Sequence, residues 1–125
     1  MTVLVDTSVI IDALQGDASA SALLRGERLA GPLHANELTR LEVLAGMRPA
    51  EEGATRALLA VFTWHPFDET LAELAGRLGR DWLPSHRGID SADLAIAATA
   101  LSLDARLLTR NVRHFPMFAG LAAPY

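Results

Sequence analysis

The fold is decided by the opening stretch Thr2-Val3-Leu4-Val5-Asp6-Thr7-Ser8-Val9-Ile10-Ile11-Asp12. A short apolar run leads into an acid, and two hydroxyl residues and a second apolar run follow it. This pattern predicts a buried parallel strand ending at Asp6 and a helix that begins at Thr7 or Ser8. Ligands of open α/β sheets bind at the carboxyl ends of the strands, so Asp6 indicates a bound cation. The simpler interpretation is that Asp6 only caps the helix.

The composition bounds the class of protein. The chain has 125 residues, is 50% apolar and 21% charged, and contains no cysteine. These values predict one globular domain over residues 1–125, without disulfides, thiolate metal sites or a cysteine nucleophile. The opening run is interrupted by Asp6 and Asp12, which argues against a signal peptide, and no apolar stretch is long enough to span a membrane. We therefore expect a cytoplasmic protein.

The basic residues are unusual because all 11 are arginine, within a net charge of −4. The absence of lysine excludes mechanisms that need a lysine base, a Schiff base or a P-loop lysine. The net charge gives no general attraction to nucleic acid. Arginine binds phosphate in bidentate fashion, however, so local phosphate contacts remain available.

Strand patterns alternate with helix patterns along the chain. Strands are predicted at residues 3–5, 33–34, 63–67 and 106–109, and helices after the first strand and at residues 18–25, 37–45, 51–61, 69–83 and 92–101. Such alternation predicts a parallel sheet covered by helices on both faces. Neither an internal repeat nor a linker is present.

Glu42 lies on the predicted helix 37–45. On a helical wheel, the apolar stripe of this helix consists of Leu38, Leu41, Leu44 and Ala45. Glu42 falls at the edge of that stripe and not opposite it. Its side chain either faces a cleft or extends from the edge of the buried face into water.

Two further acids, Asp90 and Asp93, open a helix that is apolar almost all round and is therefore expected to be buried. With Asp90 as the N-cap, Asp93 takes the third helical position, and the two form a capping pair. Two carboxylates so close together raise each other's pKa unless a cation holds them. Both roles, helix cap and cation ligand, are open for Asp90.

The segment Thr109-Arg110-Asn111 follows the last predicted strand, so it belongs to the same edge of the sheet as Asp6. Asn111 offers an oxygen without a charge, and Arg110 is either a phosphate contact or an exposed loop arginine. The oxygen ligands expected at this edge suit Mg²⁺ or Mn²⁺ and not zinc; they are Asp6, Glu42, Asp93, Asn111 and, in its ligand role, Asp90. This chemistry points to metal-assisted hydrolysis of a phosphate ester.

Four segments, in order, resemble proteins of the PIN domain family. They are Val5-Asp6-Thr7-Ser8-Val9-Ile10-Ile11-Asp12, Glu37-Leu38-Thr39-Arg40-Leu41-Glu42-Val43-Leu44-Ala45-Gly46, Asp93-Leu94-Ala95-Ile96-Ala97-Ala98-Thr99-Ala100 and Leu107-Leu108-Thr109-Arg110-Asn111-Val112-Arg113-His114-Phe115. The likeness extends from residue 2 to about residue 118. The last segment and the size of the chain resemble most the VapC toxins of bacterial toxin–antitoxin pairs.

The resemblance implies an α/β/α three-layer sandwich around a central parallel sheet of four or five strands. It also implies an Mg²⁺-dependent or Mn²⁺-dependent endoribonuclease that forms a homodimer and is silenced by an antitoxin inserted near the site. Asp6, Glu42 and Asp93 fall on the metal-binding acids of the family. Asn111 stands where many members have a fourth acid, which weakens a second metal site.

The other implied roles concern orientation and substrate. Ser8, Thr109 and Asn111 support the acids, and RNA phosphates are expected at Arg110, Arg113 and Arg87. None of the four histidines has a carboxylate at a spacing that predicts a pair, so they are assigned to the surface or to packing.

The main alternative is a degenerate PIN domain that binds RNA or a protein partner without cleaving. A phosphoacceptor domain would need a lysine, and an aspartyl phosphatase would need a second acid where Ser8 stands.

Overall fold

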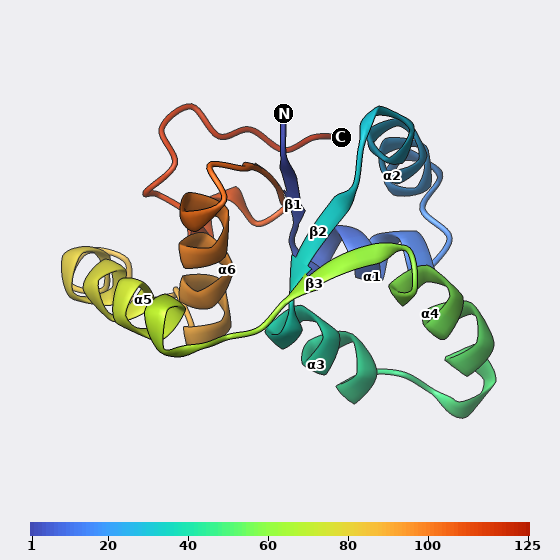
Figure 1. Cartoon of the computed structure of the whole chain (residues 1–125), viewed down its shortest axis with the longest axis horizontal. Coiled ribbons are helices and arrows are strands. Elements are labelled where there is room, and N and C mark those ends of the chain that lie inside the picture. The colour runs from blue at the N-terminus through green and yellow to red at the C-terminus, as the bar shows by residue number, and fades with distance from the viewer.

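The sheet of this protein has four strands, all parallel, in the order β3-β2-β1-β4. A computed structural model describes residues 1–125. Because the strands are parallel, their carboxyl ends meet at one edge, as the sequence predicts (Figure 1). The strands are β1 (Val3–Val5), β2 (Leu33–Asn36), β3 (Phe62–His65) and β4 (Arg106–Leu108).

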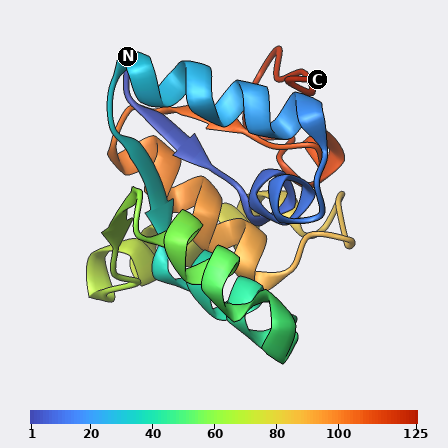
Figure 2. The ribbon, with the colours of Figure 1, turned by 90° about the vertical axis from the view of Figure 1, so that its right-hand side faces the viewer.

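Helices cover both faces of the sheet and give the predicted three layers. On one face lie α5 and α6, and on the other lie α1, α2 and α4 (Figure 1); Figure 2 looks onto this second face. None of the helices has the length and apolar character needed to cross a membrane. The helices are α1 (Thr7–Leu14), α2 (Ala18–Ala30), α3 (Glu37–Ala45), α4 (Glu52–Leu59), α5 (Glu69–Trp82) and α6 (Ser91–Ser102), with short 3-10 turns η1 (Pro49–Glu51) and η2 (Val112–His114).

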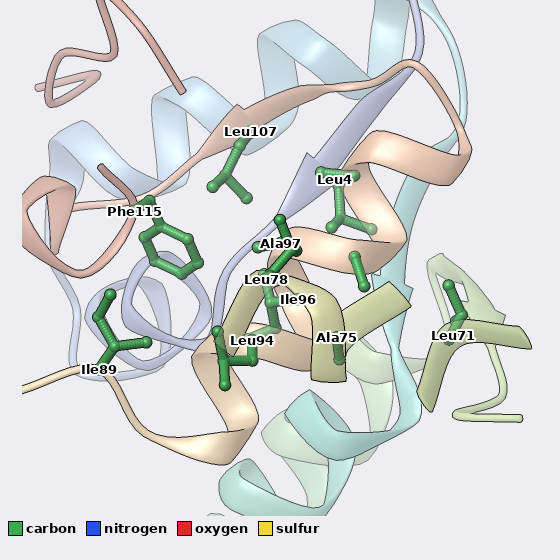
Figure 3. Packing of buried hydrophobic residues seen from close by; sticks show 12 residues of the cluster. Leu4, Leu71, Ala75, Leu78, Ile89, Leu94, Ile96, Ala97, Leu107 and Phe115 are labelled. Carbon is green, nitrogen blue, oxygen red and sulfur yellow. The ribbon is translucent and has the colours of Figure 1, made fainter. Parts of the chain in front are cut away.

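Each layer of helices has its own hydrophobic core. Leu4 and Leu107 point from the sheet toward α5 and α6, where Phe115 of the C-terminal segment closes the cluster (Figure 3). Val3 and Val5, the neighbours of Leu4, point to the opposite core with α1, α2 and α4. In α6 every residue from Asp93 to Ala100 is buried, which confirms the prediction from its apolar sequence.

A buried polar side chain fixes the helices that bear the acids. Asn36, fully buried at the end of β2, accepts a hydrogen bond from the backbone N–H of Leu38 at 2.8 Å. Its amide also donates to Thr99 Oγ1 of α6 at 2.9 Å. A buried amide costs free energy unless both of its groups are paired, so this arrangement favours one relative placement of α3 and α6.

Several predicted element boundaries are wrong. The helix predicted to end at residue 25 runs on to Ala30, because a glycine such as Gly26 weakens a helix by only about 1 kcal/mol whereas Pro32 prevents its continuation. The helix predicted at residues 51–61 begins as η1 at Pro49 and, as α4, ends at Leu59.

Candidate functional site

Asp6 is the acid at the centre of the carboxyl edge, between the ends of β1 and β4. It is 3% exposed, and its Oδ2 accepts hydrogen bonds from the hydroxyls of Ser8 and Thr109, each at 2.7 Å. Asp6 occupies the N-cap position of α1, but its side chain makes no capping hydrogen bond. Helix capping therefore does not account for this carboxylate, which two hydroxyl donors hold in one orientation.

The loop after β4 is tied to the same network through its backbone. The N–H of Arg110 donates to Ser8 Oγ at 3.1 Å, and the N–H of Asn111 donates to Thr109 Oγ1 at 2.9 Å. Ser8 and Thr109 thus lie where the sequence predicts them. Asn111 takes part only through its backbone, and the residue is exposed.

Glu42 reaches the site from α3 and is half-buried. Its Oε1 accepts a hydrogen bond from the hydroxyl of Thr7 at 2.6 Å, and Thr7 Oγ1 lies 3.1 Å from Thr39 Oγ1. Sequence reasoning missed this partner, since Thr7 was assigned only as a possible helix cap. The hydroxyl pair anchors Glu42 to the first turn of α1.

The predicted apolar stripe of α3 is wrong in two of its four members, because Leu41 and Ala45 are both exposed. Leu41 is 60% exposed, whereas Thr39 and Val43 are buried. The buried face is therefore rotated toward residues 39 and 43, because α3 packs between α1 and α6 and not flat on the sheet.

Asp93, 8% exposed, forms the predicted reciprocal capping pair with Asp90 at the start of α6. The N–H of Asp93 donates to Asp90 Oδ1 at 2.8 Å, and the N–H of Asp90 donates to Asp93 Oδ2 at 3.1 Å. Asp90 is therefore a helix cap in this structure. It is exposed, and the cap bond is made by its Oδ1.

The charge of Asp93 is poorly compensated. Burial, and then repulsion from Asp90, raise the pKa of Asp93 to about 6, although His114 Nδ1 lies 3.1 Å from its Oδ2 and acts in the opposite direction. The absence of a carboxylate partner for the histidines is thus a wrong prediction for His114. Its distance of 21 residues from Asp93 in the sequence gave no local signal. An ionised carboxyl held in this position favours a nearby cation.

The acids of this site are a candidate ligand set for a metal ion. Asp6, Glu42 and Asp93 supply only carboxylate oxygens, the donors that Mg²⁺ and Mn²⁺ prefer. As the side chains stand, no three acidic or histidine side chains are close enough together to hold an ion. The donor chemistry fits a hard divalent cation, and binding would require these carboxylates to converge.

The arginines differ in how they are held. Arg110 lies beside α1, with its NH1 3.8 Å from Asp12 Oδ2 and its guanidinium carbon 4.6 Å from the centre of the Tyr125 ring. Arg87 and Arg113 are exposed on their loops.

A groove adjoins Glu42. It has a volume of about 410 Å³, and Glu42 and Val43 of α3 form part of its wall together with Ile11 and Leu14 of α1. Its lining also includes Ala54 and Thr55 of α4. One carboxylate of the site is therefore reachable from a largely apolar groove.

The chain is similar to known proteins over nearly its whole length. A family model described as PIN domain matches residues 3–121. Ribonuclease VapC19 of Mycobacterium tuberculosis is 46% identical with 98% of each chain covered, and Ribonuclease VapC10 of the same organism is 41% identical over 98% of this chain and 92% of its own. A solved toxin-antitoxin complex from Klebsiella pneumoniae superposes with a TM-score of 0.81 at 26% identity, covering 99% of this chain and 98% of its own. This chain therefore belongs to the PIN domain family, and within it to the VapC proteins.

Proposed function

We propose that this protein is a metal-dependent endoribonuclease that acts as the toxin of a bacterial toxin–antitoxin pair. The observation that carries the proposal is Asp6, a buried carboxylate at the carboxyl edge that is oriented by Ser8 and Thr109 instead of capping its helix. Relatives at 46% and 41% identity are named ribonucleases, which supports the same activity here.

The metal would be held by Asp6, Glu42 and Asp93. Mg²⁺ or Mn²⁺ bound there would neutralise charge on the phosphoryl oxygens and lower the pKa of water at the site. The hydroxyls of Ser8 and Thr109 keep the Asp6 carboxylate in place, and Thr7 keeps Glu42 near the first turn of α1. Hydrolysis of an RNA phosphodiester is expected to leave a 5′-phosphate and a 3′-hydroxyl.

Arginines on two loops would hold the flanking phosphates of the RNA. Arg110 and Arg113 follow β4, and Arg87 precedes α6, so these loops border the carboxyl edge that carries Asp6 and Asp93. Contacts of this kind position RNA without reading its sequence.

An antitoxin is the proposed protein partner. A segment of it lying in the groove between α1, α3 and α4 would cover Glu42 and so block the site. The similarity to a solved toxin-antitoxin complex supports an antitoxin as the partner. We further propose a homodimer, acting in the cytoplasm, with one PIN domain over residues 1–125; light scattering of the purified protein measures the number of subunits.

The test is cleavage of total cellular RNA by the protein freed of any partner, in Mg²⁺, in Mn²⁺ and in EDTA. The Asp93→Asn variant is compared with Asp104→Asn, which changes an exposed acid outside the site. Discrete fragments that require a metal, form with Asp104→Asn and fail to form with Asp93→Asn are expected. RNA binding without cleavage by the folded wild-type protein, in every metal, would favour the degenerate PIN domain instead.

A further inference from the structure

Tyr125 reaches back from the C-terminal segment to the first helix. Its hydroxyl donates a hydrogen bond to Asp12 Oδ2 at 2.7 Å, across 113 residues of sequence. The same oxygen lies 3.8 Å from NH1 of Arg110, and the guanidinium of Arg110 lies over the Tyr125 ring at 4.6 Å. One aromatic ring and one carboxylate therefore both contact a single arginine.

This arginine is adjacent to the proposed reaction site. The backbone N–H of Arg110 donates to Ser8 Oγ, and Ser8 in turn donates to Asp6. The Arg110 side chain is still 43% exposed, so the ring and Asp12 do not enclose it. Part of the guanidinium remains available to a phosphate.

The ion pair with Asp12 does not by itself hold Arg110 in place. A partly exposed pair at 3.8 Å is weak, because water screens it and both side chains lose freedom when it forms. A planar guanidinium stacked on an aromatic face gains a further attraction and a defined orientation. The ring is itself held by the hydrogen bond from its hydroxyl to Asp12. Burial and this hydrogen bond raise the pKa of the Tyr125 phenol, so the hydroxyl stays a proton donor.

We propose that Tyr125 is a positioning residue that holds the Arg110 guanidinium beside the carboxyl edge, ready to bind an RNA phosphate. The inference rests on the proposed function. Arginine has many rotamers, and ordering it only when RNA arrives costs affinity. A preformed stack on Tyr125 reduces that cost, so the effect of Tyr125 on RNA binding must pass through Arg110.

The roles of ring and hydroxyl are separable. Tyr125→Phe keeps the stack and loses only the bond to Asp12, whereas Tyr125→Leu loses both. Asp12→Asn keeps an acceptor for the Tyr125 hydroxyl and removes the negative charge that competes with phosphate for Arg110. The expected order of RNA affinity is Asp12→Asn at or above the parent, then Tyr125→Phe, then Tyr125→Leu.

The experiment measures binding of a fluorescein-labelled pool of short single-stranded RNA of mixed sequence, by anisotropy over a series of salt concentrations. All proteins carry Asp93→Asn so that the RNA is not cleaved. Tyr125→Leu is expected to weaken binding about three- to tenfold. Arg110→Ala should weaken it at least as much and lower the salt slope by about 0.7, the value for one phosphate contact to a single strand.

The decisive comparison is the double variant Arg110→Ala/Tyr125→Leu, which should bind RNA no more weakly than Arg110→Ala alone. The matched control is Arg40→Ala. Arg40 of α3 also stacks on an aromatic ring, with its guanidinium carbon 4.2 Å from the centre of the Trp64 ring of β3, and it also pairs with an acid, its Nε lying 2.7 Å from Glu37 Oε2. Its substitution should leave affinity unchanged.

Two outcomes would overturn the inference alone: Tyr125→Leu binding like the parent, or Tyr125→Leu costing the same whether or not Arg110 is present. The second would assign Tyr125 a structural role. If the parent does not bind RNA at all, and the protein with Asp93 restored does not cleave it, the proposed function fails, and this inference with it.

Discussion

Asp6 and Asp93 are both buried acids at the same edge of the sheet, yet they are held in different ways. Asp6, at the end of β1, accepts hydrogen bonds from the side chains of Ser8 and Thr109. Asp93, at the start of α6, has a backbone N–H and His114 as partners and Asp90 as a like-charged neighbour. The protein orients the first carboxylate fully and leaves the charge of the second under-compensated, with its pKa raised to about 6.

The difference indicates a division of labour in the proposed metal site. Hydroxyl donors around Asp6 fix a ligand before any ion arrives, which is the role that outer partners of metal ligands perform. Asp93 has most to gain from a cation, because burial without a full counter-charge disfavours its ionised form. Variants at the two positions should therefore affect cleavage equally and stability differently.

The largest expected effect is on cleavage. Asp6→Asn and Asp93→Asn should each reduce the rate of RNA cleavage at least about a thousandfold, since a lost ligand removes several kcal/mol of transition-state stabilisation. Gel analysis of total RNA in Mg²⁺ measures the rate, and circular dichroism verifies the fold. Cleavage at the wild-type rate by either folded variant would remove that acid from the site.

A smaller loss is expected from the hydroxyl beside Asp6. Thr109→Val keeps the shape of the buried side chain but removes a donor to Asp6, and it should lower activity about ten- to a hundredfold. Thr63→Val, at an exposed position of β3, is the matched control and should cleave normally. Equal activity of the two variants would mean that the orientation of Asp6 does not depend on Thr109.

The pH dependence of protein stability should differ between variants of Asp6 and variants of Asp93. The pKa of Asp93 is higher in the folded chain than its ordinary value of 3.8, so the folded state holds this proton more tightly. The resulting stability is fully present below the ordinary value and is lost as the pH rises through about 6.

In EDTA, Asp93→Asn should therefore match the wild type at acid pH and exceed it at neutral pH, with a Tm higher by about 4 °C, which corresponds to roughly 1 kcal/mol. Asp6→Asn should show no such gain, because Ser8 and Thr109 both donate hydrogen bonds to the Asp6 side chain. Melting curves across the pH range test this. A difference between wild type and Asp93→Asn that stays constant with pH would show that the Asp93 charge is compensated.

The smallest effect is expected at Asp90. Asparagine caps helices as well as aspartate does, so Asp90→Asn should preserve α6 and leave cleavage within about twofold of the wild type. Asp90→Ala loses the cap and should cost about 1 kcal/mol of stability. A tenfold loss of Mg²⁺ affinity in Asp90→Asn would instead make Asp90 a metal ligand.

Much of the framework could be predicted from local patterns. Three features each depend on only a few neighbouring residues, and the structure confirms them. They are the apolar strand before Asp6, the N-cap of α3 at Asn36 and the capping pair Asp90–Asp93. The parallel order of the strands follows from their alternation with helices. The roles of the acids in binding metal stay predictions.

What sequence reasoning missed depends on contacts between distant parts of the chain. Asp93 and His114 are 21 residues apart, and Asp12 and Tyr125 are 113 apart. Which side chains meet across such separations is set by the register of β1 against β4 and by the path of the C-terminal segment. The exposure of Leu41 likewise reflects where α3 packs, which its own periodicity does not reveal.

The most direct test of the central claim is calorimetric titration of Mg²⁺ into the metal-free wild-type protein near pH 8, beside Asp93→Asn and Asp104→Asn. The account predicts binding by the wild type and by Asp104→Asn, and none by Asp93→Asn. Equal binding by all three proteins, or by none of them, would contradict a metal site built on Asp6, Glu42 and Asp93.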